Sequence, residues 1–192
     1  MKIKECFIDT ETTSVDVTKA GVWEIGGIIR IDGKEKERFC FNCDIFDDDE
    51  VDLKALEMNG MTIKDLAKFP DPFDTYKKLI DILDKYVDRY DKTDKFFFMG
   101  YGAEFDAKIL RRWFEGMGDQ FFGARFFSPW ICVMTIAAHY LMKDRYKMEN
   151  FKLHSVLKHL GISYDDSKLH NALYDAEMAM SIYDQFKLFK NY

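Results

Sequence analysis

Residues 3–13 read IKECFIDTETT, an apolar run that ends in acidic residues and threonines. After a short polar stretch comes a second apolar run, VWEIGGIIRI, at residues 22–31. Both runs are rich in β-branched and aromatic side chains, which is typical of strands. Asp32-Gly33 follows at once and favours a tight hairpin turn into a third strand. We therefore expect an antiparallel meander of three strands, at residues 3–8, 22–31 and 35–42.

The rest of the chain alternates between helical patterns and short apolar strands. The run KFFFMGY at residues 95–101 is almost wholly apolar, as a central strand covered on both faces is, and residues 126–133 favour a fifth strand. Helical patterns are predicted at residues 53–59, 63–68, 72 to about 90, 103–117, beyond 133 to about 142, 153–160 and 172 to about 189. This order predicts an α/β domain with a mixed five-stranded sheet flanked by helices.

The composition is that of a soluble globular protein. The 192 residues fit one domain spanning residues 1–192, with 47% hydrophobic and 32% charged residues. The formal net charge of −6 argues against a protein that coats long duplex DNA, because such binding depends on Lys and Arg at phosphates. For the acidic run DIFDDDEVD at residues 44–52 a solvated loop is favoured over a metal site, because EF-hand spacing is absent.

The four cysteines give no strong signal. Cys40 and Cys43 form a C-x-x-C pair, but no second pair or histidine motif accompanies it to complete a zinc site. The pair lies in a strand-like run, whereas a thioredoxin-type redox motif lies at the start of a helix. Nothing resembles a signal peptide, and no apolar run approaches the roughly 20 residues that span a bilayer. We therefore expect reduced thiols, a cytoplasmic protein and no membrane partner.

Two carboxylates stand at the end of the first strand. In extended backbone, residues i and i+2 point to the same face, so Asp9 and Glu11 project side by side. Adjacent carboxylates repel unless a cation lies between them, and hard cations such as Mg²⁺ or Mn²⁺ prefer oxygen ligands. On this pair alone, two exposed acids at a strand end are the favoured interpretation.

Asp106 follows the central apolar strand, in the first turn of the next predicted helix. A carboxylate there can simply stabilise the helix N-terminus. However, the ends of strands in open α/β sheets are also where sites assemble. If the first and fourth strands are parallel neighbours, Asp106 emerges at the same sheet edge as Asp9 and Glu11.

His170 and Asp175 belong to the run HNALYD. A spacing of five on one helix would place them on different faces. Asn171 is a good N-cap, so His170 is expected in the preceding loop and Asp175 one turn into the helix. This arrangement combines a fixed carboxylate with a mobile imidazole. The other three histidines fall in helical patterns and are interpreted as structural: His139, His154 and His159.

Together these residues resemble the DEDDh branch of the DnaQ-like 3′–5′ exonucleases, in the ribonuclease H-like superfamily. The similar motifs are FIDTETT at residues 7–13, GAEFD at 102–106 and HNALYDA at 170–176, in the family's order and spacing across nearly the whole chain. Intervening stretches are similar too: WEIG at 23–26, ALEMNGMT at 55–62 and residues 153–162. One departure is Tyr101-Gly102, where the family often has His-Asn; the missing Asn puts substrate contacts in doubt more than catalysis.

The resemblance implies a ribonuclease H-like fold and a two-metal-ion reaction with Mg²⁺ or Mn²⁺. By resemblance, Asp9 bridges the two ions, Glu11 and Asp175 complete the shell of the ion that binds the attacking water, and Asp106 acts partly through water. His170 takes a proton from that water, a role that suits an imidazole.

The resemblance also implies substrate contacts. It assigns the backbone of Thr10 and Thr12 to the terminal nucleotide. Phe105 is a further candidate, although packing beneath the site is favoured for it. The implied partner is a single-stranded DNA or RNA 3′ end, and a protein partner such as a polymerase is compatible with the sequence.

Two other functions stay open at this point. One is a catalytically retired nucleic-acid-binding or proofreading-accessory domain of the same fold. The intact set of five residues argues against it, because a retired site has no physical reason to keep crowded carboxylates. The other is a different metal-dependent hydrolysis, since fold does not fix function.

Overall fold

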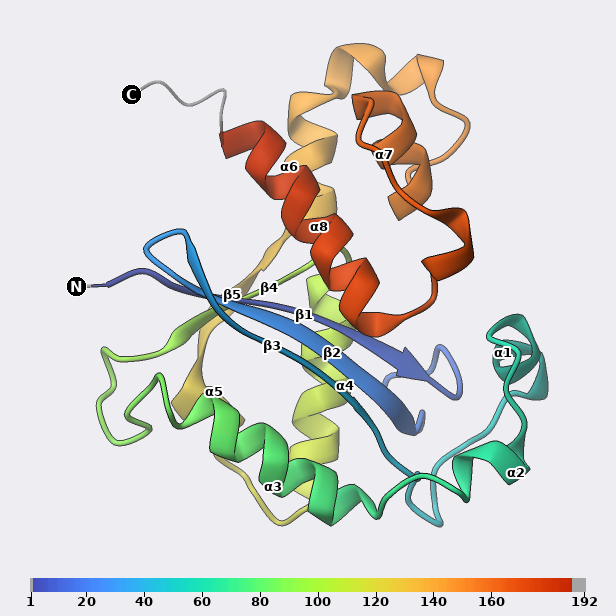
Figure 1. The fold of residues 1–192 in the computed structure, drawn as a ribbon, viewed down its shortest axis with the longest axis vertical. Coiled ribbons are helices and arrows are strands. Elements are labelled where there is room, and N and C mark those ends of the chain that lie inside the picture. Colours follow the sequence, from blue (N-terminus) through green and yellow to red (C-terminus); the bar gives the residue numbers. More distant parts are fainter. Residues whose placement is uncertain (1, 188–192) are drawn as a thin grey trace.

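The computed structural model describes residues 2–187 and contains a five-stranded sheet in the order β3-β2-β1-β4-β5 (Figure 1). The strands are β1 (Lys4–Thr12), β2 (Val22–Ile31), β3 (Lys34–Asn42), β4 (Phe96–Gly100) and β5 (Phe126–Cys132). β2 pairs antiparallel with both β1 and β3, whereas β4 pairs parallel with both β1 and β5. The predicted mixed sheet, a three-stranded meander plus two parallel strands, is confirmed.

The hairpin between β2 and β3 turns at the predicted dipeptide. Asp32 and Gly33 have φ values of 51° and 74°. A type I′ turn, whose twist matches that of the paired strands, requires positive φ at both central residues. Asp and Gly adopt positive φ more readily than most residues, which explains the Asp-Gly sequence. In the adjoining β1–β2 register, Asp9 lies opposite Gly26 and Glu11 lies opposite Glu24.

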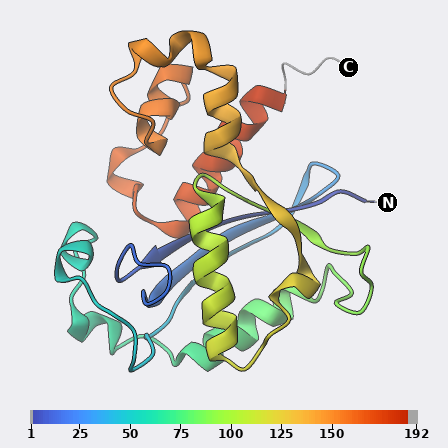
Figure 2. The same ribbon diagram turned by 180° about the vertical axis from the view of Figure 1, so that it is seen from behind.

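Helices cover both faces of the sheet, as Figures 1 and 2 show from opposite sides. They are α1 (Leu53–Met58), α2 (Ile63–Leu66), α3 (Pro72–Leu83), α4 (Ala103–Gly116), α5 (Phe122–Arg125), α6 (Val133–Tyr140), α7 (Leu153–Leu160) and α8 (Ala172–Lys187), with short 3₁₀ turns at η1 (Met142–Lys147) and η2 (Asp166–Lys168). α6, α7 and α8 lie on one face, and α3, α4 and α5 lie on the other (Figure 1). α1 and α2 lie near the end of β1 and the start of β2 (Figure 1).

Two apolar cores follow from the alternation of side chains along the strands. Ile8 packs into the core beneath α3 and α4, while its neighbour Phe7 packs into the core beneath α6, α7 and α8. Because residues i and i+2 share a face, Asp9 and Glu11 lie on the same side of β1 as Phe7. The strand thus presents both carboxylates toward α8.

One predicted helix is too long. The apolar spacing predicts α3 to about Tyr90, but the helix ends at Leu83. The next residue, Asp84, accepts hydrogen bonds of 2.7 and 3.0 Å from the buried Arg125, and the chain then turns. Tyr86 and Val87 still reach the core from this turn, so their apolar character does not depend on a helix. The predicted end of α8 near Phe189 lies outside the described residues.

The acidic run at residues 44–52 is not wholly a solvated loop. The side chain of Asp49 is only 1% exposed and accepts a 2.6 Å hydrogen bond from Arg112 on α4. It also accepts a 3.0 Å bond from the backbone N–H of Phe46. One carboxylate of the run therefore anchors the segment to α4.

Within residues 2–187, no helix is long and apolar enough to cross a bilayer.

Candidate active site

Four carboxylates meet where β1 and β4 end, and we call them the acidic cluster: Asp9, Glu11, Asp106 and Asp175. β1 supplies the first two, α4 supplies Asp106 from its first turn, and α8 supplies Asp175 from its first turn. Glu11 and Asp106 are buried, and the other two are partly exposed. The parallel pairing of β1 with β4 brings Asp106 to the end of β1, and the packing of α8 on β1 and β2 brings Asp175 there.

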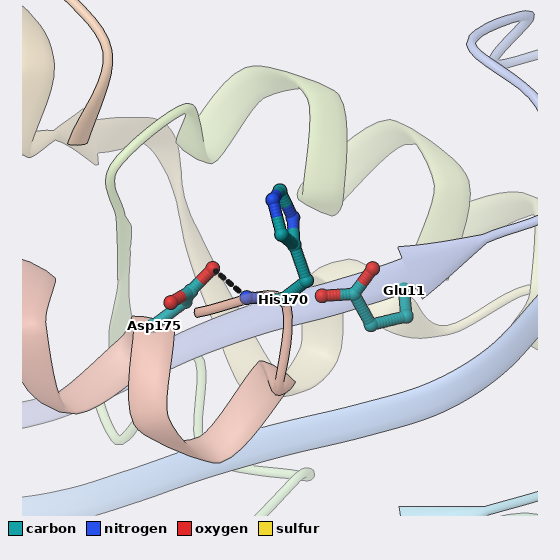
Figure 3. A group of neighbouring side chains, drawn as sticks. All are labelled: Glu11, His170 and Asp175. Atoms are coloured by element: carbon teal, nitrogen blue, oxygen red, sulfur yellow. Dashed lines mark hydrogen bonds between the residues drawn. The ribbon is translucent and has the colours of Figure 1, made fainter. Parts of the chain in front are cut away.

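His170 joins two of these carboxylates. A ring nitrogen of His170, an oxygen of Glu11 and an oxygen of Asp175 lie within 4.8 Å of one another. The imidazole projects from the loop before α8, with Asp175 to one side and Glu11 to the other (Figure 3). His170 is exposed, so its ring is accessible from solvent.

Thr10 holds Asp106 in place. The backbone N–H and the hydroxyl of Thr10 both donate to Oδ1 of Asp106, at 3.1 and 2.8 Å. Close approach of the two strands behind this contact depends on Gly100, where a Cβ would lie 2.7 Å from the carbonyl oxygen of Ile8. Thr10 therefore links β1 to α4, a role that the sequence did not indicate.

The predicted cap of α8 is present. Oδ1 of Asn171 accepts a 3.1 Å hydrogen bond from the backbone N–H of Tyr174, as an N-cap does. His170 precedes it with a φ of 66°, a left-handed conformation that is uncommon outside glycine. Its backbone N–H donates to Oδ2 of Asp175 at 3.3 Å (Figure 3). The loop thus fixes the position of His170 relative to Asp175.

Thr12 and Phe105 lie beside the acidic cluster in the chain and in space. The hydroxyl of Thr12 donates to the carbonyl of Ser14 at 2.9 Å. Phe105 is half-buried and packs against the core beneath α3 and α4. Their contacts with a substrate stay a prediction. At Gly102 a Cβ would have no atom within 4 Å, so packing does not require glycine in place of the family's usual Asn.

Glu24 is a member of the site that the sequence analysis missed. It is buried on β2, and its Oε1 accepts hydrogen bonds from the backbone N–H of Ala172 at 2.7 Å and from Nδ2 of Asn171 at 2.9 Å. The available signal was a charged residue inside the apolar run VWEIGG. A Glu at such a position is buried only when it is paired.

Comparison with known proteins identifies the family. The RNase_T model, described as Exonuclease, matches residues 6–183. This chain belongs to the RNase_T exonuclease family. The resemblance to DnaQ-like exonucleases of the ribonuclease H-like superfamily is thereby confirmed. No curated protein matches the sequence.

Solved structures share the exonuclease fold. Exonuclease I superposes with a TM-score of 0.76 at 17% identity, over 97% of this chain and 41% of that chain. E. coli exonuclease I in complex with a dT13 oligonucleotide gives 0.74 at 18% identity, over 97% and 42%. A 3′-exonuclease that recognises a histone mRNA stem-loop gives 0.71 at 16% identity, over 97% and 82%. This chain thus spans about two fifths of exonuclease I.

The electrostatics of this exonuclease fold suit a bound cation. Burial, followed by the charges of neighbouring carboxylates, raises the pKa of Glu11 to about 8 and that of Asp9 well above its usual range. Burial likewise raises the pKa of Asp106 to about 7 and that of Asp175 to about 6. Oδ1 of Asp175 is buried with no hydrogen-bond partner among the described residues. Crowded carboxylates with a spare oxygen fit a hard divalent cation.

These pKa values predict a pH-dependent effect of Mg²⁺ on stability. A carboxyl whose pKa is raised by folding binds more protons in the folded state, so the free energy of unfolding falls as pH rises from the ordinary pKa values of 3.8 and 4.5 to the folded values of about 6 and about 8. A divalent cation held by these carboxylates would take the place of those protons at higher pH. We expect the rise in Tm on adding Mg²⁺ to be larger near pH 8 than near pH 5, measured by thermal unfolding against EDTA. Equal shifts at both pH values would contradict a cation held by the acidic cluster.

The close packing of the α8 backbone on β2 at Gly26 gives a second prediction. A Cβ at Gly26 would lie 2.0 Å from the backbone nitrogen of Leu173 and 2.3 Å from the carbonyl carbon of Ala172. We expect Gly26→Ala to lower the free energy of unfolding by about 1–3 kcal/mol, as overpacking does, and to weaken the Mg²⁺ effect because Asp175 moves with the helix. Urea unfolding with and without Mg²⁺ measures both.

Gly102→Ala is the matched control, because a Cβ there meets open space. It is expected to leave the free energy of unfolding and the Mg²⁺ effect close to those of the wild type. A Gly26→Ala protein that behaves like this control would show that α8 does not depend on the close approach.

Proposed function

We propose that this chain is a metal-dependent 3′–5′ exonuclease, and that residues 1–192 form one exonuclease domain. One observation supports the proposal: in a chain that matches the exonuclease family, the acidic cluster lies where β1 and β4 end, and a ring nitrogen of His170 lies within 4.8 Å of oxygens of Glu11 and Asp175. This chain covers 41% of exonuclease I. The proposal therefore concerns the activity of this chain alone and carries over nothing else from that longer protein.

The acidic cluster is proposed to hold two Mg²⁺ or Mn²⁺ ions. When bound, the ions stabilise the charge that develops on the attacking and leaving oxygens of the phosphodiester. The protein's own contribution is placement: β1 fixes Asp9 and Glu11, Thr10 fixes Asp106, and the first turn of α8 fixes Asp175. These anchors keep the carboxylates together despite their mutual repulsion.

His170 is proposed to act as the general base. Its exposed imidazole accepts the proton of the attacking water, and rotation of the side chain carries that proton to solvent. The hydrogen bond from the backbone N–H of His170 to Asp175 keeps the loop close to the acidic cluster, while the side chain of His170 is exposed to solvent. This division suits a base that must load and unload a proton in each cycle.

The proposed substrate is a single-stranded DNA or RNA with a free 3′ end. Exonuclease I, which has the same fold, is solved in complex with a dT13 oligonucleotide, and a 3′-exonuclease of this fold recognises a histone mRNA stem-loop. The fold therefore accommodates both DNA and RNA. We propose that the backbone of Thr10 and Thr12 faces the terminal nucleotide, with Phe105 packing beneath it. The net charge of −6 favours a grip on a few nucleotides over a long duplex.

A comparison of linear and circular substrates tests this proposal. Linear single-stranded DNA and RNA of one sequence, and closed circles of the same sequence, are incubated with the protein in Mg²⁺ or Mn²⁺. We expect loss of at least one linear strand and full survival of both circles, because an exonuclease needs an end. Cleavage of the circles would replace the proposal with an endonuclease. A protein that binds Mg²⁺ and oligonucleotide but leaves every strand intact would be the retired binding domain.

A further inference from the structure

Glu24 occupies an unusual position behind the acidic cluster. In the β1–β2 register it lies directly opposite Glu11. Two like charges directly opposite one another on a sheet are destabilising. Glu24 is nevertheless buried, with 7% of its surface exposed. A buried carboxylate in such a place requires specific partners.

Three of those partners are amide donors, which engage both carboxylate oxygens of Glu24. Oε1 accepts from the backbone N–H of Ala172 at 2.7 Å and from Nδ2 of Asn171 at 2.9 Å, and Oε2 accepts from Nδ2 of Asn42 at 2.9 Å. Ala172 is the first residue of α8, so Glu24 binds one of the N–H groups that the helix itself leaves unpaired. Both oxygens of Glu24 are thus engaged by the protein, whereas Oδ1 of Asp175 is buried with no hydrogen-bond partner among the described residues.

The contact with Asn171 also sets the orientation of the N-cap. Because Nδ2 of Asn171 donates to Glu24, Oδ1 of Asn171 faces the start of α8. There it accepts a 3.1 Å hydrogen bond from the backbone N–H of Tyr174. His170 is the residue just before this cap, and Asp175 lies one turn after it. Gly26, two residues along β2, lets the backbone of α8 rest directly on the strand. Glu24 thus joins the start of α8 to β2 through Asn171 and Ala172, which lie between His170 and Asp175 in the chain.

We infer that Glu24 is a positioning residue for the nuclease reaction, which acts by holding the α8 N-terminus so that His170 and Asp175 face the acidic cluster. The inference rests on the proposed function for its effect on turnover. Its structural part, the tie between β2 and α8, does not depend on nuclease activity and has its own readout.

Three variants of Glu24 and one of Asn42 separate the effect of side-chain length from the effect of charge. Glu24→Ala removes the acceptor. Glu24→Asp keeps the charge but withdraws the oxygens by one methylene. Glu24→Gln loses the charge but keeps an oxygen for Ala172 and Asn171, while its amide faces Asn42, whose own amide can rotate to accept. Asn42→Ala is the matched control, since both α8 donors keep their partner.

We expect Glu24→Ala and Glu24→Asp to lower kcat by about 10- to 100-fold with little change in KM, because small misplacements of reacting groups have effects of that size. Glu24→Gln and Asn42→Ala are expected to stay within about threefold of the wild type. Amide hydrogen exchange supplies the second readout. Residues 170–176 should exchange faster in the Ala and Asp variants, while β1 and β2 stay protected.

The outcomes separate the two proposals. If the wild type has no nuclease activity, the proposed function fails, and hydrogen exchange still tests the tie. If the wild type is active and Glu24→Asp matches it in kcat and in exchange, the positioning role is overturned. Equal losses in Glu24→Gln and Glu24→Asp, with faster exchange across the whole sheet, would also overturn it, because that pattern marks a merely structural residue. A Glu24→Ala protein that fails to fold leaves the Asp and Gln pair to decide.

Discussion

Asp9→Asn is expected to lower kcat/KM by at least about a thousandfold, which corresponds to ~4 kcal/mol of transition-state stabilisation. Burial, followed by the charges of all three other members of the acidic cluster, raises the pKa of Asp9, so this carboxylate shares their crowded environment. Asn has nearly the same shape but cannot supply a carboxylate to a cation. The measurement is single-turnover cleavage of a labelled oligonucleotide at saturating Mg²⁺.

The same variant is expected to unfold at a higher temperature than the wild type in EDTA. Removing one of four crowded carboxylates relieves repulsion that no cation offsets under those conditions. Loss of activity combined with gain of stability is the pattern of a functional carboxylate, whereas a structural one loses both. Asp48→Asn, in the exposed part of the acidic run, is the control and should change neither quantity. Full activity in Asp9→Asn would remove Asp9 from the proposed mechanism.

His170→Ala is expected to reduce turnover by about 100- to 10,000-fold and to leave cation binding intact. The imidazole is exposed and the acidic cluster keeps all its oxygens without it, so the loss falls on proton transfer. Mn²⁺ titration calorimetry and kcat, measured on the same preparation, test the two halves of this statement. His154→Ala, within α7, is the control for loss of an imidazole elsewhere.

A second variant separates chemistry from backbone strain at this position. His170 has a φ of 66°, where Ala is strained and Asn is better tolerated. His170→Asn should therefore keep the loop and still lose turnover. Nuclease activity unchanged in both variants would exclude His170 as the base. Loss of Mn²⁺ affinity in both would instead make the residue a cation ligand.

The sequence predicted most of the sheet because the relevant signals are local. The β-branched runs gave β1 and β2, and Asp32-Gly33 gave the turn with its two positive φ values. Alternation along β1 placed Asp9 and Glu11 on one face without knowledge of what covers it. The end of α3 was missed because it depends on Arg125, a residue distant in the chain that engages Asp84.

The residues predicted for the site lie together in the structure, but the contacts of Glu24 and Thr10 that hold them in place were not predicted. Glu24 contacts Ala172 across 148 positions of the chain, so its role emerges only once α8 is seated on β2. The pairing of Thr10 with Asp106 spans 96 positions and depends on the parallel β1–β4 contact. Local patterns identify which carboxylates are present, whereas the tertiary fold determines what holds them together.

Cleavage of a 5′-labelled single strand, followed over time with Mg²⁺ or with EDTA, tests the central claim most directly. A metal-dependent 3′–5′ exonuclease yields a ladder of labelled products that shortens one nucleotide at a time from the 3′ end, and EDTA stops it. Immediate release of short labelled products, internal cuts, or the same ladder in EDTA would contradict the account.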